Sequence, residues 1–277
     1  MASPNDLTTL TVVQEWLSAN GTSPGNTDTV LSRLITTCSA SILSYLQRAS
    51  LLSQTYTDTF SGNGGRKYFL NQWPVTSVQS VTVDGQAVLQ SPDGIEPGWV
   101  LDTWNGYPPG SEQAVTLIGG SCFNRGRSNV TIVYTAGYLV SKEAAVVPAT
   151  PYQVTVAQPL GNWTQDAGVT YANGTPLAKV ASAPAVGQYS VAPAGVYTFA
   201  AADAAAAVLI SYSYVPASVD DACMNLVSER YRYRARIGMR SQSIGGQTTT
   251  SYDISDVPAY IKMQLQNFRS VLPLGPG

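Results

Sequence analysis

Apolar residues near the start of the chain recur at the three-and-four spacing of amphipathic helices. A short helix is predicted first, with Thr11 and Gln14 as a capping box ahead of it and Gly21 at its end. A longer helix is predicted over residues 28–48. The apolar positions that share one face of this longer helix are Leu31, Leu34, Ile35, Cys38, Ile42, Tyr45 and Leu46.

The same helical period returns toward the C-terminus. A helix is predicted over residues 218–237, with Ser218 as its N-cap and Gly238 as its terminator. A closing helix begins at Asp256 and carries Pro258 inside its first turn. Because each helix needs a partner for its apolar face, we expect the N-terminal and C-terminal helices to pack on one another.

Between the helices the apolar period changes to two, which is typical of β-strands. Residues 56–60 and 67–70 predict a hairpin around a glycine-rich turn at 62–65. Residues 78–89 predict a second hairpin around Asp84-Gly85, a strong turn dipeptide. This stretch therefore predicts a small antiparallel β domain.

Residues 148–216 differ from the rest of the chain in composition. They contain one lysine, Lys179, and two aspartates, Asp166 and Asp203. Short segments rich in Val, Tyr and Thr alternate with turn residues, at the spacing of an all-β sandwich or barrel. The segments are residues 154–156, 169–171, 188–191, 195–199 and 208–212.

These patterns together predict an α+β fold in which the N-terminal and C-terminal helices build a helical core. A small antiparallel β domain and an inserted all-β module, sandwich-like or barrel-like, complete it. The predicted segments are 1–51 for the N-terminal helices, 52–147 for the β domain, 148–216 for the module, and 217–277 for the C-terminal helices and an arm.

Composition narrows the possible functions. Charged residues make up 12% of the chain, about half of the usual share, so much of the surface is neutral. The absence of histidine excludes catalytic pairs, metal sites and pH switches that depend on it. Three widely spaced cysteines and the lack of a paired-carboxylate motif favour no metal, no cofactor and no catalytic residues, so we expect a protein that is not an enzyme. No signal peptide or membrane span is expected.

A basic cluster is the most distinctive feature of the sequence. It contains five of the eleven arginines, interleaved with Tyr231 and Tyr233, and no acidic residue lies between Arg230 and Tyr252. Arginines at the end of a helix complement its dipole, but one or two residues suffice for that. We therefore expect them to line a DNA channel or to contact another subunit. They are Arg230, Arg232, Arg234, Arg236 and Arg240.

The segment after this cluster, residues 241–251, is rich in Ser, Thr and Gly and predicts a mobile loop or an extended arm. Its candidate contact residues toward a neighbouring subunit or another partner are Ile244, Gly245, Gly246 and Tyr252.

Several motifs, in this order, resemble the head-tail connector (adaptor) family of tailed bacteriophages. The opening Leu10 to Leu17 and the helix that ends in Tyr45-Leu46-Gln47-Arg48 come first. The segment Leu70 to Gly85 and the strand Tyr134-Thr135-Ala136-Gly137-Tyr138 follow. Val215-Pro216 and Tyr231-Arg232-Tyr233-Arg234 complete the set, so the resemblance covers residues 7–140 and 215–270.

The resemblance implies a virion structural protein at the head-tail joint, assembled in the host cytoplasm. It implies a ring of roughly a dozen copies under the portal protein, in contact with tail, stopper or tail-tube proteins, with viral double-stranded DNA in its lumen and no membrane partner. Residues 148–216 depart from the family pattern. This module is a candidate for outward decoration, contact with tail components or bracing of adjacent subunits.

An alternative interpretation is a glycan-binding or adhesive β-rich virion protein. It is motivated by Trp99, Trp104, Trp163 and the 16 tyrosines. Aromatic side chains are more often buried in cores than exposed to sugars, so this remains the second hypothesis.

Overall fold

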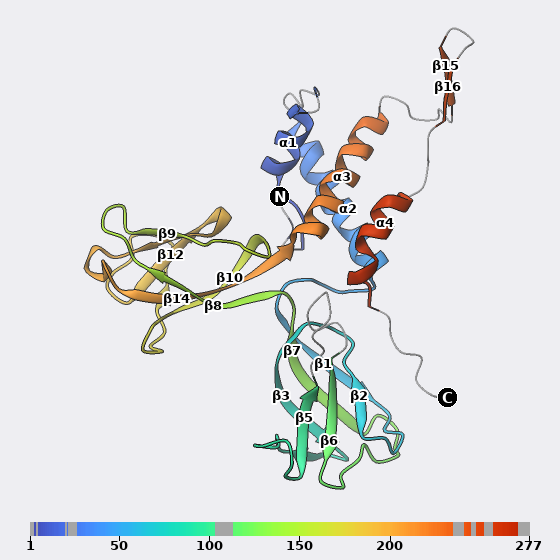
Figure 1. The fold of residues 1–277 in the computed structure, drawn as a ribbon, viewed down its shortest axis with the longest axis vertical. Coiled ribbons are helices and arrows are strands. Elements are labelled where there is room, and N and C mark those ends of the chain that lie inside the picture. Colours follow the sequence, from blue (N-terminus) through green and yellow to red (C-terminus); the bar gives the residue numbers. More distant parts are fainter. Residues whose placement is uncertain are drawn as a thin grey trace. The chain divides into compact units, whose positions relative to one another are not determined.

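The computed structural model describes residues 3, 5–19, 21, 27–102, 113–234, 241–244, 248–251 and 257–270 (Figure 1). The chain divides into two compact units. One is formed by Met1–Ser50 with Val215–Arg269, and the other by Leu51–Tyr214 with Ser270–Gly277. The first unit is mainly helical, and the second consists mainly of β-strands.

The helical unit contains α1 (Leu10–Ala19), α2 (Asp28–Leu46), α3 (Ala217–Tyr233) and α4 (Ala259–Leu265). Helix α2 contacts α1 and α3, and α3 also contacts α4, so helices from both ends of the chain do pack together. Most of the predicted apolar face of α2 is confirmed, because Leu31, Ile35, Cys38, Ile42 and Leu46 are buried. The other two predicted members, Leu34 and Tyr45, are half-buried. Among the described helices, α2 alone is long and apolar enough to cross a membrane, yet this face is buried within the unit, as in a core helix.

The helix ends differ in detail from the predicted caps. The backbone N–H of Val12 donates to the hydroxyl of Thr9 at 3.4 Å, so Thr9 takes the role predicted for Thr11. Pro216 precedes the first turn of α3 in place of Ser218. Pro258 likewise lies just before α4, not within it. Sequence patterns locate a helix better than they locate its first residue.

Residues 51–138 of the second unit form two sheets. One has the order β1-β7-β3-β4 and the other the order β2-β6-β5. The strands are β1 (Gln54–Phe60), β2 (Lys67–Phe69), β3 (Val75–Val83), β4 (Gln86–Val88), β5 (Gly98–Asp102), β6 (Ala114–Ile118) and β7 (Val130–Ala136). Their shared core comprises Leu70, Val75, Val81, Val83, Trp99, Val115, Leu117, Phe123, Val130, Ile132, Tyr134 and Ala136.

One of the two predicted hairpins is confirmed and the other is wrong. Strands β3 and β4 pair around Asp84-Gly85, both with positive φ, as the turn dipeptide predicted. Strand β1 does not pair with β2: it pairs with β7, while β2 pairs with β6. The glycine segment between them is instead bound by Phe123, which accepts from the N–H of Gly64 and donates its own N–H to the carbonyl of Gly65.

A buried polar contact joins the first sheet to the segment that leads into β3. The Tyr134 hydroxyl donates to Asp58 Oδ2 at 3.1 Å and accepts from the N–H of Gln72 at 3.1 Å. The N–H of Asn71 also donates to Asp58 Oδ2. Directly after Ala136, Gly137 has φ +139 and lies so close to the Leu52 carbonyl that a Cβ would be 2.3 Å from that oxygen. This position therefore requires glycine.

The rest of the second unit forms two further sheets, β10-β14-β8 and β11-β12-β13-β9. Antiparallel pairing of β8 with β14 brings Val146 opposite Ala207, so the two ends of residues 147–206 lie side by side (Figure 1). The strands are β8 (Leu139–Val146), β9 (Gln153–Thr155), β10 (Gly161–Tyr171), β11 (Ala178–Lys179), β12 (Gln188–Ala192), β13 (Val196–Phe199) and β14 (Ala207–Pro216).

The predicted fold class is wrong. The helices at both ends are present, but the described chain is mostly β and is not organised around a helical connector core. The error arose because the helical periodicity at the ends is strong, whereas the strands between them are short and individually weak signals. Those strands together account for more of the described residues than the helices do.

Candidate functional site: the arginines of helix α3

Helix α3 begins directly after β14 and is held by a continuous buried face. Val219, Ala222, Cys223, Leu226 and Val227 are all buried, and they contribute to the contact of α3 with α2. The Cys223 thiol lies 3.5 Å from the Ser39 hydroxyl of α2. Burial raises the pKa of both Cys223 and Cys38, and for Cys38 to about 11, so these thiols stay protonated and structural.

The first arginine of the cluster faces the interior of the helical unit. Arg230 is half-buried, and its positive charge acts on the Cys38 thiol of α2, where it opposes part of the pKa increase caused by burial. A half-buried guanidinium next to a neighbouring helix is suited to packing within the unit. Arg230 is therefore the least accessible of the three cluster arginines that the structure describes.

The next two arginines are exposed. Arg232 and Arg234 both lie in the last turn of α3 or directly after it, and both are solvent-exposed. The Arg234 guanidinium carbon lies 3.9 Å from the ring centroid of Tyr231, which is a cation–π contact. Tyr231 is itself buried, and its hydroxyl lies 3.4 Å from that of Thr27. The Tyr231 ring thus holds the Arg234 guanidinium in place, while the N–H groups of Arg234 stay at the surface.

The remaining predicted site residues can be placed only in part. Arg236, Arg240, Gly245, Gly246 and Tyr252 lie outside the described residues. Ile244 ends β15 (Ser241–Ile244), whose backbone pairs with β16 (Thr248–Ser251). In the residues described, the segment predicted as a mobile loop or extended arm is therefore a two-stranded hairpin.

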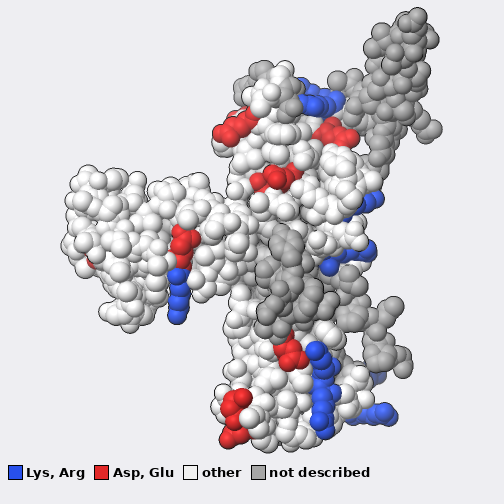
Figure 2. Space-filling view, in the orientation of Figure 1, with Lys and Arg blue, Asp and Glu red and all other residues white. Residues whose placement is uncertain are grey.

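Exposed guanidinium groups can bind phosphate or carboxylate oxygens through paired N–H donors. On the face that Figure 2 shows, Lys and Arg side chains occupy only a few places on a described surface that is mostly uncharged. No group of three or more His, Cys, Asp or Glu side chains in the described part of the chain could hold a metal ion. The arrangement is thus suited to binding an anionic partner.

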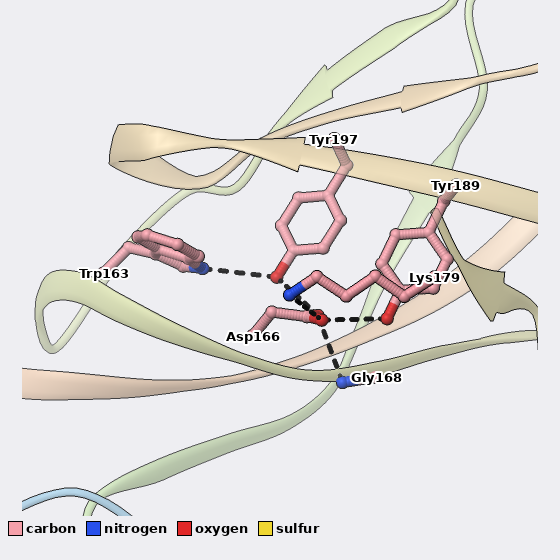
Figure 3. A network of polar contacts seen from close by, with 6 residues as sticks. All are labelled: Trp163, Asp166, Gly168, Lys179, Tyr189 and Tyr197. Carbon is pink, nitrogen blue, oxygen red and sulfur yellow. Dashed lines mark hydrogen bonds and ion pairs between the residues drawn. The ribbon is translucent and has the colours of Figure 1, made fainter. Parts of the chain in front are cut away.

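A second polar cluster, which the sequence did not single out, lies within residues 148–214 (Figure 3). The Asp166 carboxylate accepts from Tyr189 at 2.9 Å, from Tyr197 at 3.2 Å and from the N–H of Gly168 at 3.1 Å. Lys179 pairs with the same carboxylate at 3.1 Å. With only 4% of its side chain exposed, Asp166 binds strands from both sheets together and offers no open site.

The tryptophans that motivated the glycan-binding alternative are committed to packing where they are described. Trp99 is 6% exposed, and Trp104 lies outside the described residues. The Trp163 indole N–H donates to the Tyr197 hydroxyl at 3.2 Å. Its ring lies against Gly195, where a Cβ would come within 3.0 Å of the ring atoms. Trp99 is therefore buried, and Trp163 is partly buried with its indole N–H already bonded within the fold.

Comparison with known proteins identifies the class to which this architecture belongs. Residues 6–145, just over half of the chain, match the model of the family described as head completion protein. The chain belongs to the head completion protein family. No curated protein matches the sequence.

The protein is accordingly a structural component of a phage virion, associated with the head, and it interacts with other head or tail components. The family points to a structural, non-enzymatic role. The resemblance to phage head proteins is confirmed at this level, whereas the specific connector assignment stays a prediction. Helix α3 and residues 148–214 lie outside the matched range.

Proposed function

We propose that this protein forms a ring under the portal, joins the capsid to the tail and continues the channel for viral DNA. The observation that carries the proposal is the exposed pair Arg232 and Arg234 at the end of a firmly packed helix. No acidic residue follows in the sequence until after Tyr252, so no carboxylate of this segment competes for them. Repeated around a ring, such a pair makes a basic band suited to phosphate.

The surface of the protein supports an assembled state. Charged residues are depleted at the centres of protein interfaces, and this chain has few of them throughout. Net charge −2 argues against a free-standing nucleic-acid binder, but not against a local basic band inside a ring. Low charge and a local basic cluster together favour a channel-forming structural protein over a soluble DNA-binding protein.

We also propose that residues 148–216 are a module inserted into a surface loop. The pairing of β8 with β14 supports an insertion whose adjacent ends are residues 147 and 206, where the N–H of Val147 donates to the carbonyl of Ala206 at 2.9 Å. Pro216 lies at the other end of β14, so the segment with adjacent ends is shorter than 148–216. Adjacent ends are what an insertion into an existing fold requires. On this interpretation the segments 1–51, 52–147 and 217–277 are the parts that the module interrupts.

The first experiment measures the mass and shape of the purified protein, alone and mixed with the portal protein of the same phage. Native mass spectrometry and negative-stain imaging are expected to show annular particles of about a dozen copies with a central hole. A protein that stays monomeric in both conditions would contradict the proposed ring.

The second experiment tests the arginines. Arg232→Glu with Arg234→Glu is expected to leave the helical unit folded, because both side chains are exposed, and to reduce retention of packaged DNA. Binding of double-stranded DNA to rings of the unaltered chain should weaken as salt rises, with a log–log slope of about −0.9 for each phosphate contacted.

The matched control is Arg33→Glu with Arg127→Glu, which makes the same change of charge at two exposed positions elsewhere. Circular dichroism checks that both double variants fold. If the control loses DNA retention as severely as the Arg232/Arg234 variant, the effect belongs to net charge and the proposed role of the two arginines is wrong.

A further inference from the structure

The loop between β4 and β5, residues 89–97, presents two apolar side chains to solvent. Leu89 is 79% exposed and Ile95 is 80% exposed, the highest values among the large hydrophobic side chains described. Burial of apolar surface is favourable, so the exposure of these side chains on a folded protein has a cost that a binding partner would remove. Two such residues in one short loop favour a contact site.

The exposed tip of this loop is held in a fixed conformation. Asp93 Oδ1 accepts from the backbone N–H groups of Ile95 and Glu96, each at 2.9 Å. The Ser91 hydroxyl accepts from the N–H of Gly94 at 3.0 Å. The same backbone donors hold the pKa of Asp93 below its usual range. Ile95 is thus presented by a preorganised turn, which lowers the entropic cost of binding.

The base of the loop is equally well fixed. The N–H of Trp99 donates to the Leu89 carbonyl, and the N–H of Ser91 donates to the Trp99 carbonyl, both at 3.0 Å. At the other end, Pro97 packs against Gly119, where a Cβ would come within 2.4 Å of the Pro97 α-carbon. Because both ends are tied to the sheet, the exposed side chains cannot turn inward without breaking these contacts.

The charge around the loop indicates the chemistry of its partner. Between Lys67 and Arg125 the sequence has no basic residue. The loop itself carries two acidic residues, Asp93 and Glu96. An apolar loop with acidic side chains is complementary to a basic surface that also offers apolar area.

The chain itself carries such a surface in the last turn of α3. Arg232 and Arg234 are exposed, half-buried Tyr233 lies between them in the sequence, and no acidic residue follows up to Tyr252. The stems of arginine and the ring of tyrosine supply apolar area beside the charge. Both residue types are enriched at protein interfaces for this reason.

We propose that the 89–97 loop of one copy docks on the arginine end of α3 of a second copy. Leu89 and Ile95 pack on the arginine stems and Tyr233, and Glu96 pairs with a guanidinium. Because the two surfaces differ, the contact runs head to tail and closes into a ring when the rotation permits. The inference rests on the proposed ring and names the surfaces that build it.

The first test is the assembly of full-length chain that carries Leu89→Ser with Ile95→Ser. Loss of two buried apolar anchors should raise the concentration for half-maximal association at least about a hundredfold. The matched control, Leu160→Ser with Val186→Ser, removes two other exposed apolar side chains and should assemble as the unaltered chain does. Sedimentation velocity gives the association state, and circular dichroism checks the fold of each variant.

The second test mixes two variants that are each defective in one surface. The Leu89→Ser/Ile95→Ser chain keeps its arginines, and the Arg232→Glu/Arg234→Glu chain keeps its loop. Each should be monomeric alone, and the mixture should give one-to-one dimers without rings, since only one intact contact is available. Glu96→Arg introduced into the Arg232→Glu/Arg234→Glu chain should restore part of its self-association.

The outcomes separate this inference from the proposed function. Rings that persist in the loop variant overturn the loop contact and leave the ring itself intact. Monomeric loop variants that form no dimer with the arginine variant show that the loop docks elsewhere, which overturns the acceptor named here. An unaltered chain that never forms rings, alone or with portal, contradicts both.

Discussion

The two β regions of the second unit are held together by different means. Residues 51–138 enclose a continuous apolar core, in which Ile132 and Val115 are completely buried. Residues 139–214 depend more on tyrosine hydroxyls that donate to buried or partly buried carboxylates. These pairs are Tyr212 with Glu143 at 2.6 Å, Tyr171 with Asp203 at 2.7 Å, and Tyr189 and Tyr197 with Asp166.

This difference explains how a region with so few charges can be stable. Asp166 and Asp203 are the only acidic residues of 148–216, and both are used inside the fold. A buried carboxylate is costly unless its oxygens accept hydrogen bonds, and here tyrosines and backbone N–H groups meet that requirement. The surface that remains is nearly neutral, as an assembly component requires.

The largest loss of stability is expected from a substitution in the apolar core of residues 51–138. Ile132→Ala, at a position with 0% exposure, should lower the free energy of unfolding by about 4 kcal/mol through lost burial and an unfilled cavity. Urea unfolding followed by circular dichroism measures it. Leu89→Ala, at an exposed position of the same region, should change the value by less than about 0.5 kcal/mol. Equal losses for the two variants would mean that burial in this core does not dominate the stability of the region.

The second-largest loss of stability is expected from removal of the Asp166 carboxylate, which lies at the centre of Figure 3. Asp166→Ala leaves two tyrosine hydroxyls and a backbone N–H without their acceptor, and it should cost about 3 kcal/mol. Hydrogen exchange should increase in β10, β12 and β13. The control Asp102→Ala removes a more exposed carboxylate that pairs with Lys67, and it should cost no more than about 1 kcal/mol. Unchanged exchange in the three strands would refute the role assigned to Asp166.

A smaller loss of stability is expected when a single tyrosine hydroxyl is removed. Tyr197→Phe should cost about 1–2 kcal/mol, because the hydroxyl both donates to Asp166 and accepts from Trp163. Tyr134→Phe, the matched change in the other region, removes a donor to Asp58 and an acceptor for Gln72 and should cost a similar amount. Denaturant unfolding compares the two. A much larger loss for Tyr134→Phe would show that the first region depends more on such a hydrogen bond than the second, which would contradict the comparison.

The pH dependence follows from the same tyrosines. Burial, reinforced by the charge of Asp166, raises the pKa of Tyr189 and Tyr197 above the usual value of about 10. Their contribution to stability is therefore fully present below pH of about 10 and is lost as pH rises above it, because the unfolded chain releases the phenolic protons more readily. Spectroscopic titration should show these tyrosines ionising only with unfolding. Ionisation near pH 10 in the folded protein would contradict their burial.

Local sequence signals predicted several elements of the fold. The spacing of Leu31, Ile35, Cys38 and Ile42 was sufficient for α2, because a helical face is decided by neighbours three and four residues away. Asp84-Gly85 was sufficient for the β3–β4 turn for the same reason. The predicted pairing of β1 with β2 failed because strand partners are selected by distant residues, here those of β7 and β6.

Some features of the candidate site were likewise predictable from the sequence, and others depend on the folded structure. The arginine cluster, its tyrosines and the lack of nearby acids are properties of the sequence alone. Which arginine packs inward could not be predicted, because that depends on Cys38 of α2 and on the buried ring of Tyr231. Composition likewise distinguished residues 148–216 from the rest of the chain. It could not predict that Asp166 accepts hydrogen bonds from two tyrosines. Periodicity and composition act over a few neighbouring residues, whereas burial, strand partners and hydrogen-bond acceptors depend on contacts between distant parts of the chain, which only the folded structure brings together.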